Sequence, residues 1–351
     1  MDDHAPPGKS GRARGPHPLP LFLATVTRVC GGDRARLARV LAGARVYQAA
    51  PDPPPRPDRA IVAAAGEVTL RDHGRAGDPI VVVVPSVINP ATVLDLAPGN
   101  SLLDAMAAAG LRPLRVDWGA IPAADPAHLV ERHLLPLIAG LGVPVAIIGY
   151  CVGGTLSLAA AQLLGSRVRR LALLATPWHF GAYPTAVQSG LADWWAGARP
   201  LATGLGRLPI DLLQPAFWSL DEAGLADKYA RLAYTADAAE IEAFVRLEDW
   251  SNSGAPLPLP LASALFDDFF AADTPGRGAW RAGGSVIDPA ALACPVLDIV
   301  ATRDRLVPAA TRIAAQPGIE RRDLAAGHVG MIVGRDAPRQ LWAPLAAWLA
   351  G

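Results

Sequence analysis

Short apolar runs alternate with amphipathic segments along most of the chain, a pattern that predicts strands followed by helices. The apolar runs predict strands at residues 80–84, 114–117, 143–148, 168–174 and 296–301, and a weaker one at 318–324. Helical spacing of apolar residues predicts helices at 33–49, 101–109, 128–141, 153–164 and 336–349. Strands that alternate with helices are joined by right-handed crossovers and form parallel sheets. We therefore expect an α/β fold with a mostly parallel sheet.

The alternation stops between residues 178 and 285. This stretch is helical and rich in loops, and it contains six of the nine tryptophans. We expect residues 61–177 and 286–351 to form the α/β core, and residues 178–285 to form an inserted helical cap, or lid. Residues 1–60 are expected to comprise a flexible basic tail, an N-terminal helix and a proline-rich connector with the sequence PDPPPRPD.

Composition excludes several classes of protein. Apolar residues make up 51% of the 351 residues and charged residues 18%, so the chain has ample apolar surface for a core and is not disordered as a whole. Basic and acidic residues balance at 32 each, which gives no overall attraction to nucleic acid. Three cysteines are too few for a disulfide framework, so we expect reduced thiols and a cytoplasmic location.

Two apolar stretches resemble targeting or membrane segments. Residues 19–26 could imitate a secretory signal, but Pro20 interrupts them and no small-residue cleavage site follows. Residues 133–166 contain no Asp, Glu, Lys or Arg. Proline and glycine residues divide this stretch, which therefore predicts a helix end, a buried strand, a tight turn and a buried helix rather than a membrane span.

The sequence Gly149-Tyr150-Cys151-Val152-Gly153-Gly154 lies directly between a predicted strand and a predicted helix. This is the arrangement of a nucleophile elbow, with cysteine at the position often held by serine. Gly149 and Gly153 fit the elbow because a side chain at either position would collide with neighbouring backbone. A helix N-terminus also favours a thiolate at Cys151. The alternative is a buried cysteine in a glycine-rich turn.

An elbow nucleophile requires an acidic residue and then a histidine later in the chain. Asp304 follows the predicted strand 296–301, and His328 follows the weaker strand 318–324 between two glycines. Taken singly, Asp304 fits a turn or a helix cap, and His328 fits a solvated loop. Their order and their positions after strands favour a Cys151–His328–Asp304 triad, because active sites of parallel sheets lie at the carboxyl ends of the strands.

Backbone groups near the elbow are predicted to form an oxyanion hole. The N–H of Val152 is one expected donor, and the second lies in the loop after strand 80–84, where Val87 is the first choice and Ile88 the next. The sequence has no glycine-rich phosphate loop and no Cys/His cluster with metal-ligand spacing, so no cofactor and no metal site are expected.

Several motifs together resemble the polyhydroxyalkanoate synthases. They are GYCVGGTL at the elbow, VPSVINP with the later LDLAPGNSL, VDWG at 116–119, and CPVLDIVATRDRLVP with the later GHVG. The similarity extends over about residues 60–351 and is weaker in the insertion. The length is similar to that of the catalytic subunit of the two-subunit (class III) enzymes.

The resemblance implies an α/β-hydrolase fold in which Cys151 is the nucleophile, His328 the general base and Asp304 its partner. It implies transfer of 3-hydroxyacyl groups from CoA thioesters, which are substrates, through an acyl-cysteine to a growing polyester. It also implies a cap that covers the site and mediates homodimerisation, and it leaves open a second synthase subunit and a location at the surface of polyester granules.

The sequence departs from the family at two positions. The family usually has histidine directly after the catalytic aspartate, where this chain has Arg305, and Pro90 stands where a basic residue is common. The triad is intact, and these departures leave polymerisation open. Two alternatives therefore remain. One is a cysteine-dependent hydrolase, such as a thioesterase, a polyhydroxyalkanoate depolymerase or a dienelactone-hydrolase-like enzyme. The other is a non-catalytic granule-associated protein.

Overall fold

A computed structural model describes residues 14–351, which divide into two compact units. The first, here called the helical unit, combines the chain up to Pro54 with Asp221–Asn252. The second, here called the sheet unit, comprises Pro55–Leu220 and Ser253–Gly351. The predicted basic tail lies largely in residues 1–13, outside the described residues.

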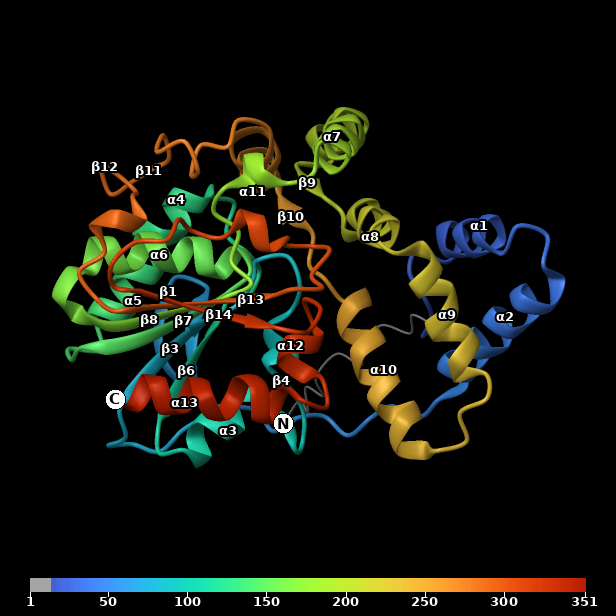
Figure 1. Cartoon of the computed structure of the whole chain (residues 1–351), viewed down its shortest axis with the longest axis horizontal. Helices are drawn as coiled ribbons and strands as arrows, with labels where there is room; N and C mark the ends of the chain where they lie inside the picture. Colours follow the sequence, from blue (N-terminus) through green and yellow to red (C-terminus); the bar gives the residue numbers. More distant parts are fainter. Residues whose placement is uncertain (1–13) are drawn as a thin grey trace, which may run out of the picture. The chain divides into compact units, whose positions relative to one another are not determined.

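An eight-stranded sheet forms the centre of the sheet unit (Figure 1). Its spatial order is β1-β2-β6-β3-β7-β8-β13-β14, in which β1–β2 and β2–β6 pair antiparallel and all other neighbours pair parallel. The strands are β1 (Ile61–Ala65), β2 (Val68–Asp72), β3 (Ile80–Val84), β6 (Arg112–Asp117), β7 (Val145–Tyr150), β8 (Val168–Leu174), β13 (Val296–Ala301) and β14 (Ile319–Leu324). The predicted α/β fold with a mostly parallel sheet is confirmed.

The central strands are apolar along their whole length because both faces of the sheet are covered. Val81 to Val84 of β3 have no exposed surface, and every residue of β7 is buried. Strands buried on both faces do not alternate polar with apolar residues. The β1–β2 hairpin was not predicted, because β1 is alanine-rich and mostly exposed or half-buried, and it therefore lacks a strong strand signal.

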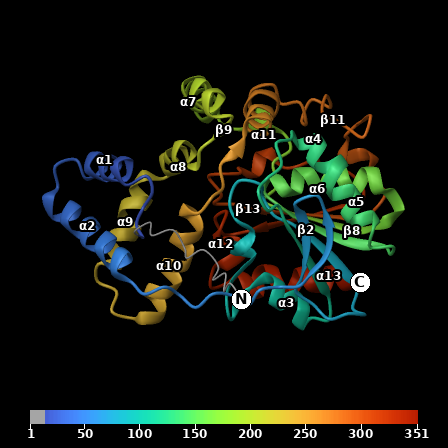
Figure 2. The ribbon, with the colours of Figure 1, turned by 180° about the vertical axis from the view of Figure 1, so that it is seen from behind.

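Helices cover both faces of the sheet. Figures 1 and 2 show α4, α5 and α6 on one face and α3 and α13 on the other. Ser101 caps α3, because its side chain accepts a hydrogen bond from the Asp104 N–H at 3.0 Å. The bounds are α3 (Leu102–Ala108), α4 (Pro126–Leu129), η2 (Val130–Leu134), α5 (Leu135–Ala139), α6 (Val152–Leu164), α12 (Gly330–Val333), η8 (Pro338–Trp342) and α13 (Ala343–Ala350).

Two further stretches of the sheet unit, 178–220 and 253–285, hold most of the aromatic side chains of the predicted cap. Trp194, Trp195 and Phe266 pack with ring centroids between 5.0 and 6.2 Å apart. The elements are η4 (Phe180–Ala182), α7 (Thr185–Leu205), β9 (Arg207–Leu208), α8 (Ile210–Ser219), β10 (Leu257–Pro258), α11 (Leu259–Ser263), η5 (Ala264–Ala271), β11 (Arg281–Ala282) and β12 (Ser285–Val286). Short elements elsewhere are η1 (Ala91–Leu94), β4 (Asp95–Ala97), β5 (Asn100–Ser101), η3 (Gly165–Arg167), η6 (Pro289–Ala291) and η7 (Ala309–Thr311).

The helical unit contains α1 (Leu19–Cys30), α2 (Arg34–Ala49), α9 (Glu222–Leu232) and α10 (Ala238–Asn252). Its core is aromatic: the ring of Tyr229 lies edge-on to Phe22, Tyr47 and Phe244 at centroid distances of 4.9 to 6.3 Å. Helices α2 and α9 are so close that a Cβ atom at Gly43 would lie 1.8 Å from the Tyr229 carbonyl oxygen. The predicted helix 33–49 is confirmed.

The division into units differs from the predicted one. The sequence pattern suggested a single cap at 178–285, whereas α9 and α10 from the middle of that stretch pack with the N-terminal helices. The physical reason is burial: the apolar side chains of α9, including Leu225 and Tyr229, are covered by α1 and α2. In residues 14–351, no helix has both the length and the apolar character that a membrane span requires.

Candidate active site

Cys151 occupies a sharp turn at the carboxyl end of β7 and directly before α6. Its backbone has φ 55° and ψ −132°, a conformation that a residue with a side chain rarely adopts. Two backbone hydrogen bonds hold the turn: the Cys151 N–H donates to the Leu174 carbonyl at 2.9 Å, and the Cys151 carbonyl accepts from the Gly154 N–H at 2.8 Å. The structure therefore places Cys151 in the predicted elbow geometry.

The glycines around Cys151 permit a very close approach of β7, α6 and the loop after β3. A Cβ atom at Gly149 would lie 2.4 Å from the Gly154 Cα atom. A Cβ atom at Gly153 would lie 2.3 Å from the Val84 carbonyl oxygen. Gly154, which the sequence analysis did not single out, would meet the Thr176 hydroxyl at 1.8 Å. Any side chain at these positions would displace the start of α6.

Asp304 and His328 lie in the loops that follow β13 and β14. The His328 Nδ1–H donates to Asp304 Oδ2 at 2.6 Å, and the Asp304 side chain has no exposed surface. The other carboxylate oxygen, Oδ1, accepts hydrogen bonds from the Leu306 and Val307 N–H groups, both at 2.8 Å. Asp304 is thus held by the backbone of its own turn and sets the direction of the His328 ring.

The environment of His328 favours its protonated form. Burial is the largest influence and favours the neutral ring, but it is outweighed by the negative charge of Cys151, by hydrogen bonds with Asp304 and Cys151, and by the charge of Asp304. Together these raise the pKa of His328 to about 10. At neutral pH the imidazolium form of His328 is therefore favoured.

The two predicted oxyanion donors, Val152 and Val87, lie at the start of α6 and in the loop after β3. Val152 is the first residue of α6, where a helix leaves its N–H groups without intrahelical partners. Val87 lies in the loop after β3, and Gly153 packs directly against the Val84 and Pro85 carbonyls at the start of that loop. The Ile88 N–H donates to Ser86 Oγ at 3.3 Å, which favours Val87 over Ile88 as the second donor.

No family model matches the chain. Curated relatives named poly(3-hydroxyalkanoate) polymerase subunit PhaC match at low identity: 26% in Thiocystis violacea, 25% in Allochromatium vinosum and 23% in Haloferax mediterranei. The matches cover 76%, 76% and 78% of this chain, and 79%, 79% and 59% of the relatives. The match therefore spans less than two thirds of the Haloferax protein.

The resemblance to polyhydroxyalkanoate synthases is confirmed. Solved structures with a similar fold include a protein from a study of carboxylesterases of Nitrososphaera gargenis and an α/β-hydrolase fold protein from Nakamurella multipartita. Each has a TM-score of 0.50, and the sequence identities are 18% and 19%, respectively. The matched regions cover 83% and 84% of this chain, and 98% and 99% of the two solved chains. The fold is that of the α/β-hydrolases.

Two buried tyrosines also contact the candidate site, and the sequence did not single them out. Tyr150 stacks on the His328 ring, and its hydroxyl donates to the His328 backbone carbonyl at 3.2 Å. The Tyr183 hydroxyl donates to the Leu306 carbonyl at 3.0 Å, in the turn that holds Asp304. Burial, followed by the charges of Cys151 and Asp304, raises the pKa of both tyrosines well above the usual value. Only Tyr150 had a signal in the sequence, its place within the elbow motif.

Among the described residues, the remaining cysteines and histidines do not assemble into a metal centre. Cys30 is a buried free thiol of the helical unit and Cys294 is half-buried, with its pKa raised by burial. His128 and His133 are ring neighbours at 6.3 Å. Within residues 14–351, no group of three or more His, Cys, Asp or Glu side chains is placed to hold a metal ion.

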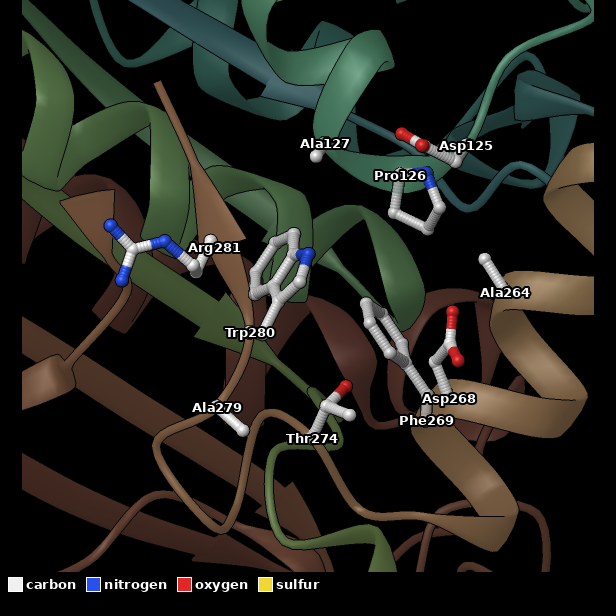
Figure 3. A pocket seen from close by; sticks show the side chains of 10 residues that line it. All are labelled: Asp125, Pro126, Ala127, Ala264, Asp268, Phe269, Thr274, Ala279, Trp280 and Arg281. Atoms are coloured by element: carbon white, nitrogen blue, oxygen red, sulfur yellow. The ribbon is translucent and has the colours of Figure 1, made fainter. Parts of the chain in front are cut away.

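A separate cavity of about 230 Å³ opens between the start of α4 and η5 (Figure 3). Phe269 and Trp280 form an aromatic wall, with ring centroids 5.2 Å apart, and Asp125 and Asp268 lie along the lining. Burial and then the nearby charges of Asp267 and Asp125 raise the pKa of Asp268. The lining residues are Asp125, Pro126, Ala127, Ala264, Asp268, Phe269, Thr274, Ala279, Trp280 and Arg281, which include none of the predicted site residues.

Proposed function

We propose that this chain is a polyhydroxyalkanoate synthase-like acyltransferase. It transfers 3-hydroxyacyl groups from CoA thioesters, through an acyl-cysteine at Cys151, to a growing polyester. The observation that carries the proposal is the placement of Cys151, on a strained elbow and hydrogen-bonded to a His328 ring that Asp304 orients. The similarity to PhaC subunits supports a CoA thioester as substrate and a polyester as product.

Acylation begins with attack of the Cys151 thiolate on the thioester carbonyl carbon. The carbonyl oxygen becomes an oxyanion, which the N–H groups of Val152 and Val87 stabilise. When the tetrahedral intermediate collapses, the bond to the CoA sulfur breaks and the proton on His328 passes to the departing CoA thiolate. The acyl group is now a thioester of Cys151, and His328 is neutral.

Transfer uses the neutral His328 as a base. Its ring accepts the proton of a 3-hydroxyl group, and the alkoxide oxygen attacks the acyl-cysteine carbonyl. The new ester bond forms as the Cys151 thiolate leaves, which restores the thiolate–imidazolium pair. An alcohol competes with water only where water is kept out, and Cys151 is 6% exposed.

The proposed reaction needs no cofactor and no metal ion, because the thioester bond itself supplies an activated acyl group. We assign the role of a cap to the aromatic stretches 178–220 and 253–285 of the sheet unit. Homodimerisation through the cap, a second synthase subunit and a location on polyester granules in the cytoplasm belong to the same proposal and follow from the family resemblance.

Incubation of the purified chain with 3-hydroxybutyryl-CoA tests the proposal. We expect release of CoA, with the acyl group recovered as polyester. Cys151→Ala should abolish CoA release, whereas the matched thiol variants Cys30→Ala and Cys294→Ala should retain it. Recovery of monomeric acid alone would replace the synthase with a hydrolase, and turnover by a folded Cys151→Ala variant would contradict the mechanism.

A further inference from the structure

Tyr150 makes two separate contacts with His328, and the reaction steps above use neither of them. The two rings stack with centroids 5.0 Å apart and an angle of 26° between their planes. The Tyr150 hydroxyl also donates to the His328 backbone carbonyl at 3.2 Å. Tyr150 is 3% exposed, and as the last residue of β7 it pairs with Leu174 of β8. A side chain fixed by the sheet therefore contacts both the ring and the backbone of His328.

We propose that Tyr150 is a positioning residue that keeps the protonated ring of His328 against Cys151. Its hydroxyl tethers the loop that carries His328, and its π face stabilises the imidazolium. The inference rests on the proposed function, because it takes His328 as the acid–base partner of Cys151. A cation over the face of an aromatic ring is attracted by the electron density of the ring. The stacked ring also restricts rotation of the imidazole, whose Nδ1 atom is already directed by Asp304.

The other charged and aromatic groups around His328 make different interactions from those of Tyr150. Cys151 and Asp304 supply the negative charges that act on the ring. Tyr183 is buried near the same two charges, but its hydroxyl bonds the Leu306 carbonyl. Arg303 and Arg305, the positive charges on either side of Asp304 in the sequence, are exposed. Their guanidinium groups donate to the Ala325 and Leu220 carbonyls, respectively. Among residues 14–351, the aromatic ring that stacks on His328 is that of Tyr150.

The ring and the tether can be tested separately by alkylation of Cys151 with iodoacetamide as a function of pH. For this experiment the substitutions Cys30→Ala and Cys294→Ala are introduced into every protein, so that Cys151 is the remaining thiol. Tyr150→Phe keeps the ring face and removes the tether. Pentafluorophenylalanine at position 150 keeps the shape of phenylalanine and withdraws electron density from the face. We expect the fluorinated variant to need a pH about half a unit higher than Tyr150→Phe for half-maximal alkylation, because less stabilisation of the imidazolium means less thiolate.

Amide hydrogen exchange of residues 326–330 measures the effect of the tether, which is the hydrogen bond from the Tyr150 hydroxyl to the His328 carbonyl. Loss of one buried hydrogen bond in Tyr150→Phe should speed this exchange by about 2- to 10-fold. Tyr47→Phe is the control, since it removes a tyrosine hydroxyl that donates to Asp249 at 2.8 Å in the helical unit. It should change neither the exchange of this loop nor the alkylation profile.

Two results would overturn the inference: identical alkylation profiles for the two ring variants, or unchanged loop exchange in Tyr150→Phe. Neither measurement uses an acyl substrate. A chain that releases no CoA but shows the expected shifts would therefore refute the proposed function and support the positioning role of Tyr150.

Discussion

Asp304 and His328 are 24 residues apart in the sequence, yet their side chains share a 2.6 Å hydrogen bond between Oδ2 and Nδ1. Two parallel strands make this possible. β13 and β14 are hydrogen-bonded neighbours from Val296–Ile319 to Ala301–Leu324, so the loops that follow them leave the same edge of the sheet. The backbone N–H groups of Leu306 and Val307 then fix the carboxylate in an orientation that faces the imidazole.

The first prediction concerns the protonation of His328. The pKa of about 10 depends on Cys151 and Asp304, which both favour the imidazolium. Cys151→Ala and Asp304→Asn should each lower this pKa, and nuclear magnetic resonance titration of the imidazole measures it. Asp304→Asn should also slow CoA release by a factor on the order of 1,000 to 10,000, because the ring loses its orienting carboxylate. A His328 titration that is unchanged in Cys151→Ala would show that the thiolate does not act on the ring.

The second prediction concerns Arg305, which stands where the synthase family usually has histidine. Its exposed guanidinium donates to the Leu220 carbonyl at 3.3 Å and is permanently charged, so it cannot transfer a proton as histidine does. Arg305→His should speed polymer elongation and leave the initial burst of CoA release nearly unchanged.

Arg305→Asn is the matched variant, because it removes the charge and supplies no titratable group. Burst and steady-state rates are measured separately for both variants. Equal acceleration in both would assign the effect to the lost charge, and no acceleration in Arg305→His would contradict the prediction.

The third prediction concerns His73, a buried histidine that directly follows β2 and is not one of the candidate site residues. Burial, followed by the positive charge of Arg115, lowers the pKa of His73 to about 4. In the unfolded chain the His73 imidazole binds a proton near pH 6.5, whereas in the folded chain it does so only near pH 4. Stability is therefore lost as the pH falls through this interval. At pH 5 this residue alone should lower the free energy of unfolding by about 2 kcal/mol relative to pH 7.5.

Denaturant unfolding at both pH values provides the measurement. His73→Gln retains an acceptor for the Arg115 guanidinium, which lies 3.4 Å from His73 Nε2, and should reduce the pH dependence. The exposed substitution His128→Gln is the control and should keep the wild-type dependence. The prediction fails if His73→Gln and wild type lose equal stability between pH 7.5 and 5.

The fourth prediction compares two helical glycines. A Cβ atom at Gly43 of α2 would lie 1.8 Å from the Tyr229 carbonyl oxygen, whereas one at Gly197 of α7 has no atom within 4 Å. Gly43→Ala should destabilise the helical unit by about 1–3 kcal/mol through overpacking. Gly197→Ala should stabilise its helix by up to about 1 kcal/mol.

Amide hydrogen exchange in residues 221–252 distinguishes the two variants. We expect faster exchange there in Gly43→Ala and no change in Gly197→Ala. Wild-type exchange of α9 in Gly43→Ala would mean that α2 does not hold this helix in solution.

The sequence by itself determined the six parallel strands of the sheet and the positions of Cys151, Asp304 and His328 after them. The strands are short apolar runs because both faces of a parallel sheet are buried, and this composition is visible without coordinates. The elbow is visible for a similar reason: only glycine tolerates the close approach at positions 149 and 153. The order of nucleophile, acid and histidine then followed from their places after successive strands.

Only the tertiary structure decided which distant side chains meet. The stacking of Tyr150 on His328 joins residues 178 positions apart, and the Tyr47–Asp249 hydrogen bond of the helical unit joins residues 202 positions apart. Local periodicity reports which face of an element is buried but not which partner buries it. The assignment of residues 221–252 to the N-terminal helices therefore depended on the packing of Tyr229 against Phe22 and Tyr47, which no local pattern encodes.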